Sequence, residues 1–241
     1  MVNEPSPHTT PTNINGMGGS GNSGWDWIAH ALKRARQACP NAVFILNDYN
    51  NVRLSGDVQH DIDIVKAIKS AGAPIDAVGC QTHGAANPPS STRKANIDKL
   101  ARGTGLPVTI TEYDLGIADA NKQKQAMQDQ FAMFWSNSNV KGISVWGYIV
   151  GSTWLANAGL MQSDGTMRPA TTWRMEFLGR LWLQRRGQGA NVSGSSSISH
   201  KRFRGREAST CVITLALPVA LGSSGGPCPG GELNTAVGSG A

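Results

Sequence analysis

Residues 107–114 read "PVTITEYD", a strand-like segment that ends on two carboxylates, Glu112 and Asp114. A segment with helical character, residues 121–135, follows it. Similar pairs recur along the chain, and the strand centres near residues 44, 78, 109 and 144 stand about 30 to 35 residues apart. That spacing is the size of a βα unit, in which a helix connects two parallel strands. The recurrence therefore predicts an α/β fold built on a parallel sheet.

The remaining segments complete a count of five strand ends and five helices. Further strands are expected in "NAVFILNDYN" (41–50), "IDAVGCQTHG" (75–84) and "KGISVWGY" (141–148), and a strand end in "VNEP" (2–5). Further helices are expected at residues 25–38, 57–71, 91–102 and 171–182. Asp57 is a candidate N-cap for the second helix, and Gly72 a candidate stop.

The polar and aromatic residues decide between an open doubly wound sheet and a (β/α)8 TIM barrel. Neither a G-x-G-x-x-G nor a Walker A loop follows any strand segment, so the phosphate cradle of most nucleotide-binding sheets is missing. Instead, polar and aromatic residues gather where the strands end, as a barrel active site requires. They are Asn3, Glu4, Asp48, Tyr49, Gln81, His83, Glu112, Asp114 and Trp146. We therefore predict an incomplete TIM barrel of about five βα units.

The composition changes near residue 184. Residues 1–183 are expected to form the barrel part, and residues 184–241 a Gly/Ser/Arg-rich linker or disordered extension. An alternative is that residues 211–221 begin a strand of a second domain. The net charge of +6 arises mainly in this tail, because there are 15 basic and 14 acidic residues up to Glu176. A solvated tail is favoured over a nucleic-acid site.

Several chemistries find no support in the sequence. The four cysteines lack metal-ligand spacing, and no second His or Cys stands near His83 at such a spacing, so we expect no metal and no cofactor. The G-x-S-x-G nucleophile elbow is absent. The longest apolar run, residues 211–221, is interrupted by Pro218 and is far shorter than a bilayer span.

Glu4 and Glu112 suit the cleavage of a glycosidic bond. That reaction uses two carboxyl groups, one to protonate the leaving oxygen and one to attack the sugar or activate water. Glu112, with Asp114 and His83 nearby, is expected to stay ionised as the nucleophile, whereas Glu4 would need a raised pKa to act as the acid. A single strand-end glutamate is more often a solvated loop residue. Two of them, accompanied by histidine and tryptophan, favour catalysis.

The aromatic residues at the predicted active end suit a sugar substrate. Trp146 and Trp154 flank the loop after the last strand segment, and the C–H faces of sugar rings are apolar. Either tryptophan could instead belong to the core, and a strand-end histidine such as His83 is often only structural. These alternatives stay open at the level of residue types.

Taken together, these segments resemble glycoside hydrolase family 10, the retaining endo-β-1,4-xylanases. "VNEP", "LNDYN", "VGCQTHG", "TITEYD" and "VWGYIVGSTW" are similar to the ends of family strands four to eight, in family order. "GLMQSDGTMRPATTW" resembles the approach to the final helix. The likeness covers roughly residues 2–180. The loop at residues 148–153 departs from the Arg/Asp-rich form of many members.

The resemblance implies a role for each matching position. Glu4 would be the acid/base and Glu112 the nucleophile, with His83 bridging Glu112 and Asp114. The substrate-binding residues would be Asn3, Tyr49, Gln81, Trp146 and Trp154. The partner implied is xylan or a xylo-oligosaccharide, without nucleic acid or membrane, and the protein is expected to be a secreted monomer.

The resemblance also implies that family strands one to three precede Glu4 and are missing from this chain. We therefore expect the chain by itself to be poorly folded and weakly active, because open strand edges and an uncovered interior favour aggregation. Two alternatives to a xylanase are another β-glycanase of the same clan, such as a cellulase, and a glycan-binding fragment without catalysis.

Overall fold

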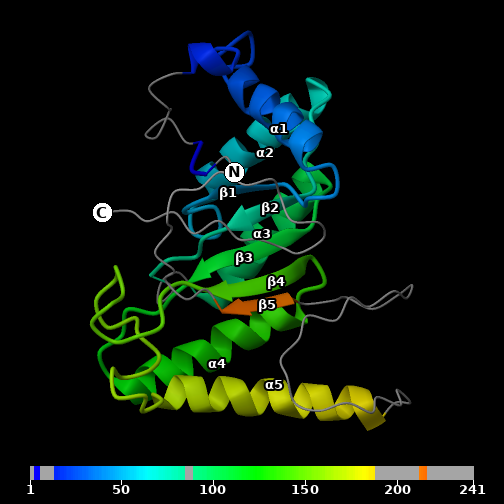
Figure 1. The fold of residues 1–241 in the computed structure, drawn as a ribbon. Helices are drawn as coiled ribbons and strands as arrows, with labels where there is room; N and C mark the ends of the chain where they lie inside the picture. The colour runs from blue at the N-terminus through cyan, green and yellow to red at the C-terminus, as the bar shows by residue number, and fades with distance from the viewer. Residues whose placement is uncertain (1–2, 6–13, 85–88, 188–211, 216–241) are drawn as a thin grey trace.

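Five parallel strands form the centre of the molecule in a computed structural model that describes residues 3–5, 14–84, 89–187 and 212–215. Their order in the sheet is the order of the sequence, β1-β2-β3-β4-β5, and all point the same way (Figure 1). The strands are β1 (Ile45–Asp48), β2 (Ala77–Cys80), β3 (Val108–Tyr113), β4 (Val140–Val145) and β5 (Val212–Leu215). Their carboxyl ends consequently meet at one edge of the sheet.

The helices follow the strands as one continuous layer. A short 3-10 turn, η1, precedes the first α-helix, and each α-helix packs against the next in the order α1, α2, α3, α4, α5. The bounds are η1 (Asn15–Met17), α1 (Asp26–Ala38), α2 (Ser55–Ser70), α3 (Ser90–Thr104), α4 (Ala120–Ser136) and α5 (Pro169–Gly187). A doubly wound sheet reverses its strand order and divides its helices between two faces. The sequential order seen here is that of a barrel wall, so the barrel-type prediction is confirmed.

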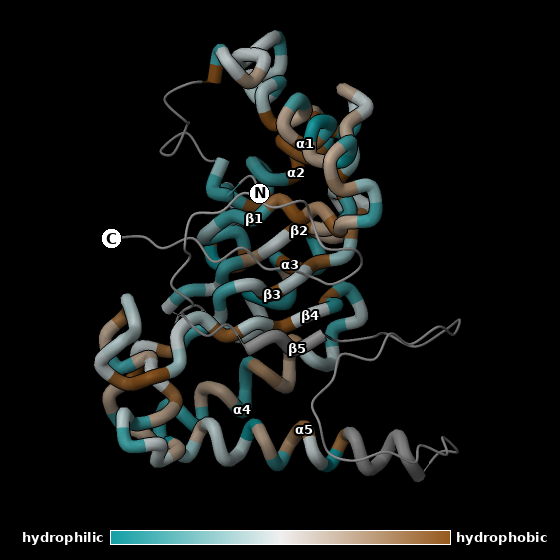
Figure 2. Tube along the Cα trace, in the orientation of Figure 1, coloured by the Kyte–Doolittle hydropathy of each residue, from teal (hydrophilic) through white to brown (hydrophobic). Residues whose placement is uncertain are grey.

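The core lies between the sheet and this helical layer. Val78, Ile110 and Ile143 of the three inner strands are fully buried, as are Ile97 of α3 and Phe134 of α4. Figure 2 shows hydrophobic colour along the strands and alternating hydrophilic and hydrophobic turns along the helices. Each such side chain contributes about 1.5 to 3 kcal/mol when buried, so the inner strands are held firmly and their ends form a stable platform.

The helix boundaries differ slightly from the sequence prediction. Asp57 is not the N-cap of α2; the helix begins at Ser55 after Leu54, and Asp57 lies in its first turn. There its charge still favours the positive end of the helix dipole. Gly72 does adopt a left-handed conformation, with φ 66°, just beyond the helix end. Such a conformation favours glycine and stops a helix.

Little of the predicted tail falls on described residues. α5 continues to Gly187, past the expected boundary at residue 183. Residues 212–215 form β5, which pairs in parallel with β4. The other residues of the 184–241 segment lie outside the described part of the chain, so the division into two regions stays a prediction. None of the helices in the described ranges is long and apolar enough to cross a membrane.

Candidate active site

Glu112 stands near the carboxyl end of β3, and both oxygens of its side chain are engaged. Oε2 lies 3.1 Å from Nε2 of His83, and Oε1 lies 2.8 Å from Nδ2 of Asn47. His83 follows β2 and Asn47 is part of β1, so three neighbouring strands supply the cluster. The Glu112 side chain is 12% exposed, which leaves it reachable from one side. A carboxylate with two donors in fixed positions is well placed to act as a nucleophile.

Asp114 anchors His83 from the other side. Its Oδ2 lies 2.8 Å from Nδ1 of His83 and accepts a bond from Nε1 of Trp154 at 3.0 Å. Its Oδ1 accepts from the backbone N–H of Gly84 at 2.7 Å. The Asp114 side chain is completely buried, so these donors replace water around it. The imidazole is therefore held between two carboxylates in a single orientation.

The charge of His83 follows from this arrangement. Burial lowers the pKa of an imidazole, but the hydrogen bonds to Asp114 and Glu112 and the charges of these carboxylates outweigh it, and they raise the pKa of His83 to about 9. At neutral pH the ring is consequently an imidazolium, and its two N–H groups donate hydrogen bonds to Asp114 and Glu112. Glu112 therefore lies against a cation.

Asn47 is the residue that sequence reasoning missed. Its Nδ2 donates to Oδ1 of Asn3 at 2.7 Å as well as to Glu112, and its Oδ1 accepts from the Thr111 hydroxyl at 2.5 Å. Room for it depends on Gly79, where an added Cβ would lie 2.5 Å from Asn47 Oδ1. The sequence could have indicated Asn47 only by its place in the strand-end segment "LNDYN", beside the candidate site residues Asp48 and Tyr49.

Glu4 reaches the same edge through two neighbours. Its backbone N–H donates to the carbonyl of Asn47 at 2.8 Å, and Nε2 of Gln81 donates to its Oε1 at 2.6 Å. The carbonyl of Gln81 accepts from the backbone N–H of Glu112 at 3.1 Å. Both glutamates thus border Asn47 and Gln81. The structure thus places the two glutamates, which lie more than a hundred positions apart in the sequence, beside the same two residues.

Two site residues have an unusual backbone conformation. Glu4 has φ 50° and Thr82 has φ 62°, both in the left-handed region. For a β-branched residue such as Thr82 this conformation is rare and costs about 1 to 3 kcal/mol. It occurs between Gln81, which contacts Glu4, and His83, which contacts Glu112. The local strain therefore coincides with the point where the polar side chains on either side of Thr82 serve the site.

The predicted aromatic residues surround His83. The Trp146 ring centroid lies 6.2 Å from that of His83 at an interplanar angle of 72°, and Trp154 lies 4.8 Å away at 71°. Trp154 is 64% exposed, an unusual state for so large an apolar ring in a folded domain. Tyr49 is half-buried just after β1.

The comparison with known families agrees with this geometry. The model of "Glycosyl hydrolase family 10" matches residues 1–176. This chain belongs to glycosyl hydrolase family 10. The resemblance seen in the sequence motifs is thereby confirmed, and with it the barrel class of the fold.

Individual relatives of this family 10 chain are xylanases. It is 42% identical over 150 residues to endo-1,4-beta-xylanase B of Cellvibrio japonicus, covering 62% of this chain and 24% of that protein. It is 28% identical to a mutant of the intracellular xylanase of Thermoanaerobacterium saccharolyticum solved with xylotetraose, with a TM-score of 0.53 over 60% of this chain and 48% of that one.

A third comparison bears on the fold alone. Xylanase 10B of Thermotoga petrophila with xylobiose is 23% identical, with a TM-score of 0.62 over 75% of this chain and 59% of that chain. The family 10 chain thus spans about half the length of its solved relatives and about a quarter of the curated one.

In the described part of the chain, no group of three or more His, Cys, Asp or Glu side chains is arranged to hold a metal ion. The catalytic and substrate-binding roles of the site residues in this family 10 chain stay predictions. The contacts described above show which atoms of each residue those roles would involve.

Proposed function

We propose that this protein hydrolyses the β-1,4-linked backbone of xylan with retention of anomeric configuration. The observation that carries the proposal is the arrangement around Glu112, whose two oxygens accept hydrogen bonds from His83 and Asn47. Glu4 stands across Asn47 and Gln81 from it. The names of the relatives add the substrate class, because they are xylanases, and one was solved with xylotetraose.

In the first step, the Glu112 carboxylate attacks the anomeric carbon while the Glu4 carboxyl group gives its proton to the leaving oxygen. The glycosidic C–O bond breaks and a glycosyl ester on Glu112 forms. His83 and Asn47 hold the nucleophile in place, so little reorganisation is needed. Trp146 and Trp154 offer aromatic faces to the sugar, and Asn3 and Tyr49 are expected to contact its hydroxyl groups.

In the second step, Glu4 takes a proton from water, and the water oxygen attacks the same anomeric carbon. The ester bond breaks, Glu112 returns to its carboxylate form, and the product keeps the β configuration. The loss of the Glu112 negative charge in the ester favours ionisation of Glu4, which suits its change from acid to base. No metal or cofactor takes part in this scheme.

The scheme is tested on Glu4 with substrates of different leaving-group ability. Glu4→Ala is expected to reduce xylan hydrolysis by about 10²- to 10⁴-fold, the usual contribution of a general acid. Hydrolysis of 4-nitrophenyl β-xylobioside should fall much less in its first step, because nitrophenolate leaves without a proton. Added azide should restore turnover and yield a β-xylobiosyl azide, detected by NMR. An α-azide product, or equal loss on both substrates, would contradict the assignment.

Parallel assays decide the substrate class. We expect release of reducing ends from xylan and none from carboxymethylcellulose; the reverse would favour a cellulase. Binding of xylotetraose without any hydrolysis would favour a glycan-binding protein. The weak activity expected of this chain is measured in the same assay, with a whole family 10 xylanase as the reference. We also propose that the protein acts outside the cell as a monomer, since polymeric xylan does not cross a membrane.

A further inference from the structure

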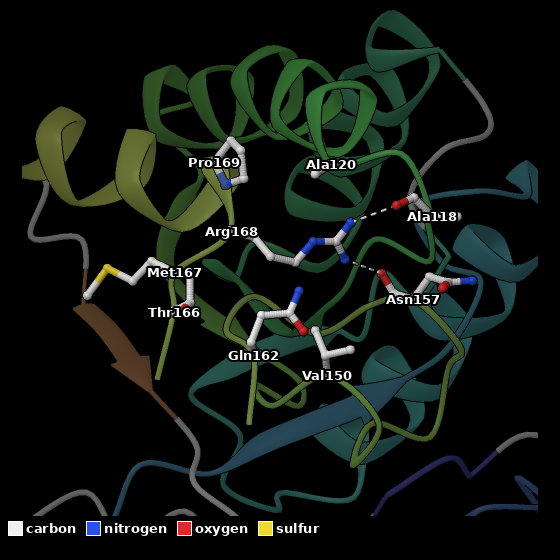
Figure 3. Close-up of a pocket in the computed structure, with 9 residues that line it drawn as sticks. All are labelled: Ala118, Ala120, Val150, Asn157, Gln162, Thr166, Met167, Arg168 and Pro169. Atoms are coloured by element: carbon white, nitrogen blue, oxygen red, sulfur yellow. Dashed lines mark hydrogen bonds between the residues drawn. The ribbon is translucent and has the colours of Figure 1, made fainter. Parts of the chain in front are cut away.

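Arg168, just before α5, joins two loops that flank the candidate active site. The side chain is buried, with 7% exposed. Its Nη1 donates to the carbonyl oxygens of Asn157 at 3.0 Å and Gly159 at 3.1 Å. Its Nη2 donates to those of Ile117 at 3.1 Å and Ala118 at 3.0 Å. Figure 3 shows the guanidinium lying between Asn157 and Ala118. All four acceptors are backbone carbonyls, so the guanidinium links the backbones of the two loops.

Gln123 of α4 connects the same two loops from inside. It is fully buried, and its Nε2 donates to the carbonyl of Leu115 at 3.0 Å and to that of Asn157 at 3.1 Å. The Asn157 carbonyl thus accepts from both Arg168 and Gln123. Buried amide and guanidinium groups are costly when they are left without such partners, so the two loops are tied together strongly.

The two loops carry the residues that orient His83. The β3–α4 loop, residues 114–119, begins with Asp114, and the β4–α5 loop, residues 146–168, includes Trp154. These two residues share the hydrogen bond from the indole N–H to Asp114 Oδ2 at 3.0 Å. The backbones approach closely, because a Cβ on Gly116 would lie 3.0 Å from the backbone carbonyl oxygen of Ala156. A shift of one loop against the other would break the bond between Trp154 and Asp114.

Trp154 depends on this support more than a core residue does. With 64% of its surface exposed, little packing fixes the ring. A cavity of about 350 Å³ lies beside Arg168, and Val150, Gln162 and Met167 also line it (Figure 3). Without the hydrogen bonds from Arg168 and Gln123, the β4–α5 loop therefore has open space to move into on that side.

We propose that Arg168 and Gln123 form a loop clamp that sets the position of Trp154 against Asp114, and thereby the affinity for a xylo-oligosaccharide. Both are positioning residues that act through Trp154. The first half of this inference concerns the conformation of the chain alone. Only its second half, the affinity, rests on the proposed function.

The first test observes Trp154 directly. The whole chain is labelled with ¹⁵N-tryptophan, the Trp154 indole signal is assigned with Trp154→Phe, and its exchange with water is measured. Arg168→Met should speed this exchange by about 10-fold or more, because a hydrogen bond worth about 1.4 kcal/mol is lost. The exchange rate in Arg168→Lys should lie between those of the parent and Arg168→Met. Gln123→Met keeps Arg168 and should speed the exchange by a smaller factor.

Arg36→Met is the matched control. Arg36 also donates to two backbone carbonyls, those of Pro40 and Ala42, but it belongs to α1. Its loss should leave the Trp154 signal and its exchange unchanged. If neither Arg168→Lys nor Gln123→Met alters the exchange in chains that melt as the parent does, the clamp is refuted. An equal effect from Arg36→Met would show only general loosening and would also refute it.

The second test measures xylotetraose binding by tryptophan fluorescence in a double-mutant cycle. Arg168→Met should weaken binding by about 10-fold in the parent chain and add nothing in a Trp154→Ala background. Equal losses in both backgrounds would mean that Arg168 acts elsewhere, and the inference would be wrong. If the parent chain itself does not bind xylotetraose, the proposed function fails, while the exchange experiment still decides whether the clamp exists.

Discussion

The molecule holds two pairs of neighbouring carboxylates, and the pairs behave differently. Glu112 and Asp114 share the imidazole of His83, and Glu112 is partly open to solvent. Asp48 and Asp61 hydrogen-bond to each other, are 3% and 2% exposed, and have the amide of Asn51 beside them, 2.7 Å from Asp61.

The difference lies in the neutralising partner. Glu112 and Asp114 both lie against the His83 imidazolium, a cation that balances their negative charge. The second pair lacks such a cation among the groups that shift it, and burial raises the pKa of Asp48 to about 6 and the pKa of Asp61 well above its usual value. Burial without a neighbouring cation thus favours the protonated forms of this pair. Two neighbouring carboxylates therefore do not by themselves identify a catalytic site.

The largest effect that this comparison predicts is on catalysis. Glu112→Ala should lower the hydrolysis of 4-nitrophenyl β-xylobioside by at least about 10³-fold, since a nucleophile that acts with its partners as a unit is lost. Glu176→Ala, an exposed residue of α5, is the control and should have no effect. The matching change in the other pair, Asp61→Asn, should leave the rate within about threefold. A larger loss for Asp61→Asn would mean that the roles of the pairs are reversed.

An intermediate effect is expected on the pH dependence of stability, and it arises from His83. The folded protein raises the pKa of His83 from 6.5 to about 9, so this group stabilises the fold fully below about pH 6.5, and the contribution is lost as pH rises through 9. The loss should amount to about 2 to 3 kcal/mol, because each pKa unit is worth about 1.4 kcal/mol and the ring is partly exposed. Thermal melting between pH 6 and 10 measures it.

The same interval should be nearly flat in His83→Gln, which keeps a hydrogen-bond donor but no titrating ring. Its activity on the activated substrate should fall by roughly 10- to 100-fold, since Glu112 loses a charged donor. Should the parent and His83→Gln lose stability equally between pH 7 and 9, then His83 is not the cation described here.

The smallest effect is on the stability contributed by the buried pair, Asp48 and Asp61, and it appears at lower pH than the effect of His83. The folded pKa of Asp48, about 6, lies above the usual 3.8, so its contribution to stability is complete below about pH 4 and is lost as pH rises through 6. A difference of about 1 to 3 kcal/mol is expected between pH 4 and 6.5. Asp61→Asn retains the shape and a donor, and should reduce this slope without changing the slope near pH 9. An unchanged slope below pH 6.5 would place the titrating group elsewhere.

Sequence periodicity predicted the strand and helix segments closely. The inner strands are short apolar runs bounded by turns, and each is followed by a helix with one apolar face. Such local patterns are visible without a structure. The start of α2 was misplaced because Leu54, at its N-cap, makes no side-chain capping bond that the sequence could reveal. The start of α4 is a contrasting case, since Asp119 accepts bonds from the N–H groups of Asn121 and Lys122.

The site was predictable in part. Glu4, Gln81, His83, Glu112 and Asp114 all follow strand-like segments, and parallel strands bring their carboxyl ends to one edge. Asn47 was missed because an asparagine within a strand carries no distinctive signal. Its importance depends on the contacts with Asn3, Thr111 and Glu112, which come from other units.

The amino-acid sequence by itself determined the repeating βα units, the family and the candidate carboxylates, because these follow from local patterns and short motifs. Only the tertiary structure decided which carboxylates lie against a cation and which are buried without one. Asp48 and Glu112 look alike as strand-end acids, and what separates them is the burial and the partners that distant segments provide. Ionisation depends on that surrounding environment, and an environment assembled from several strands cannot be read from any one of them.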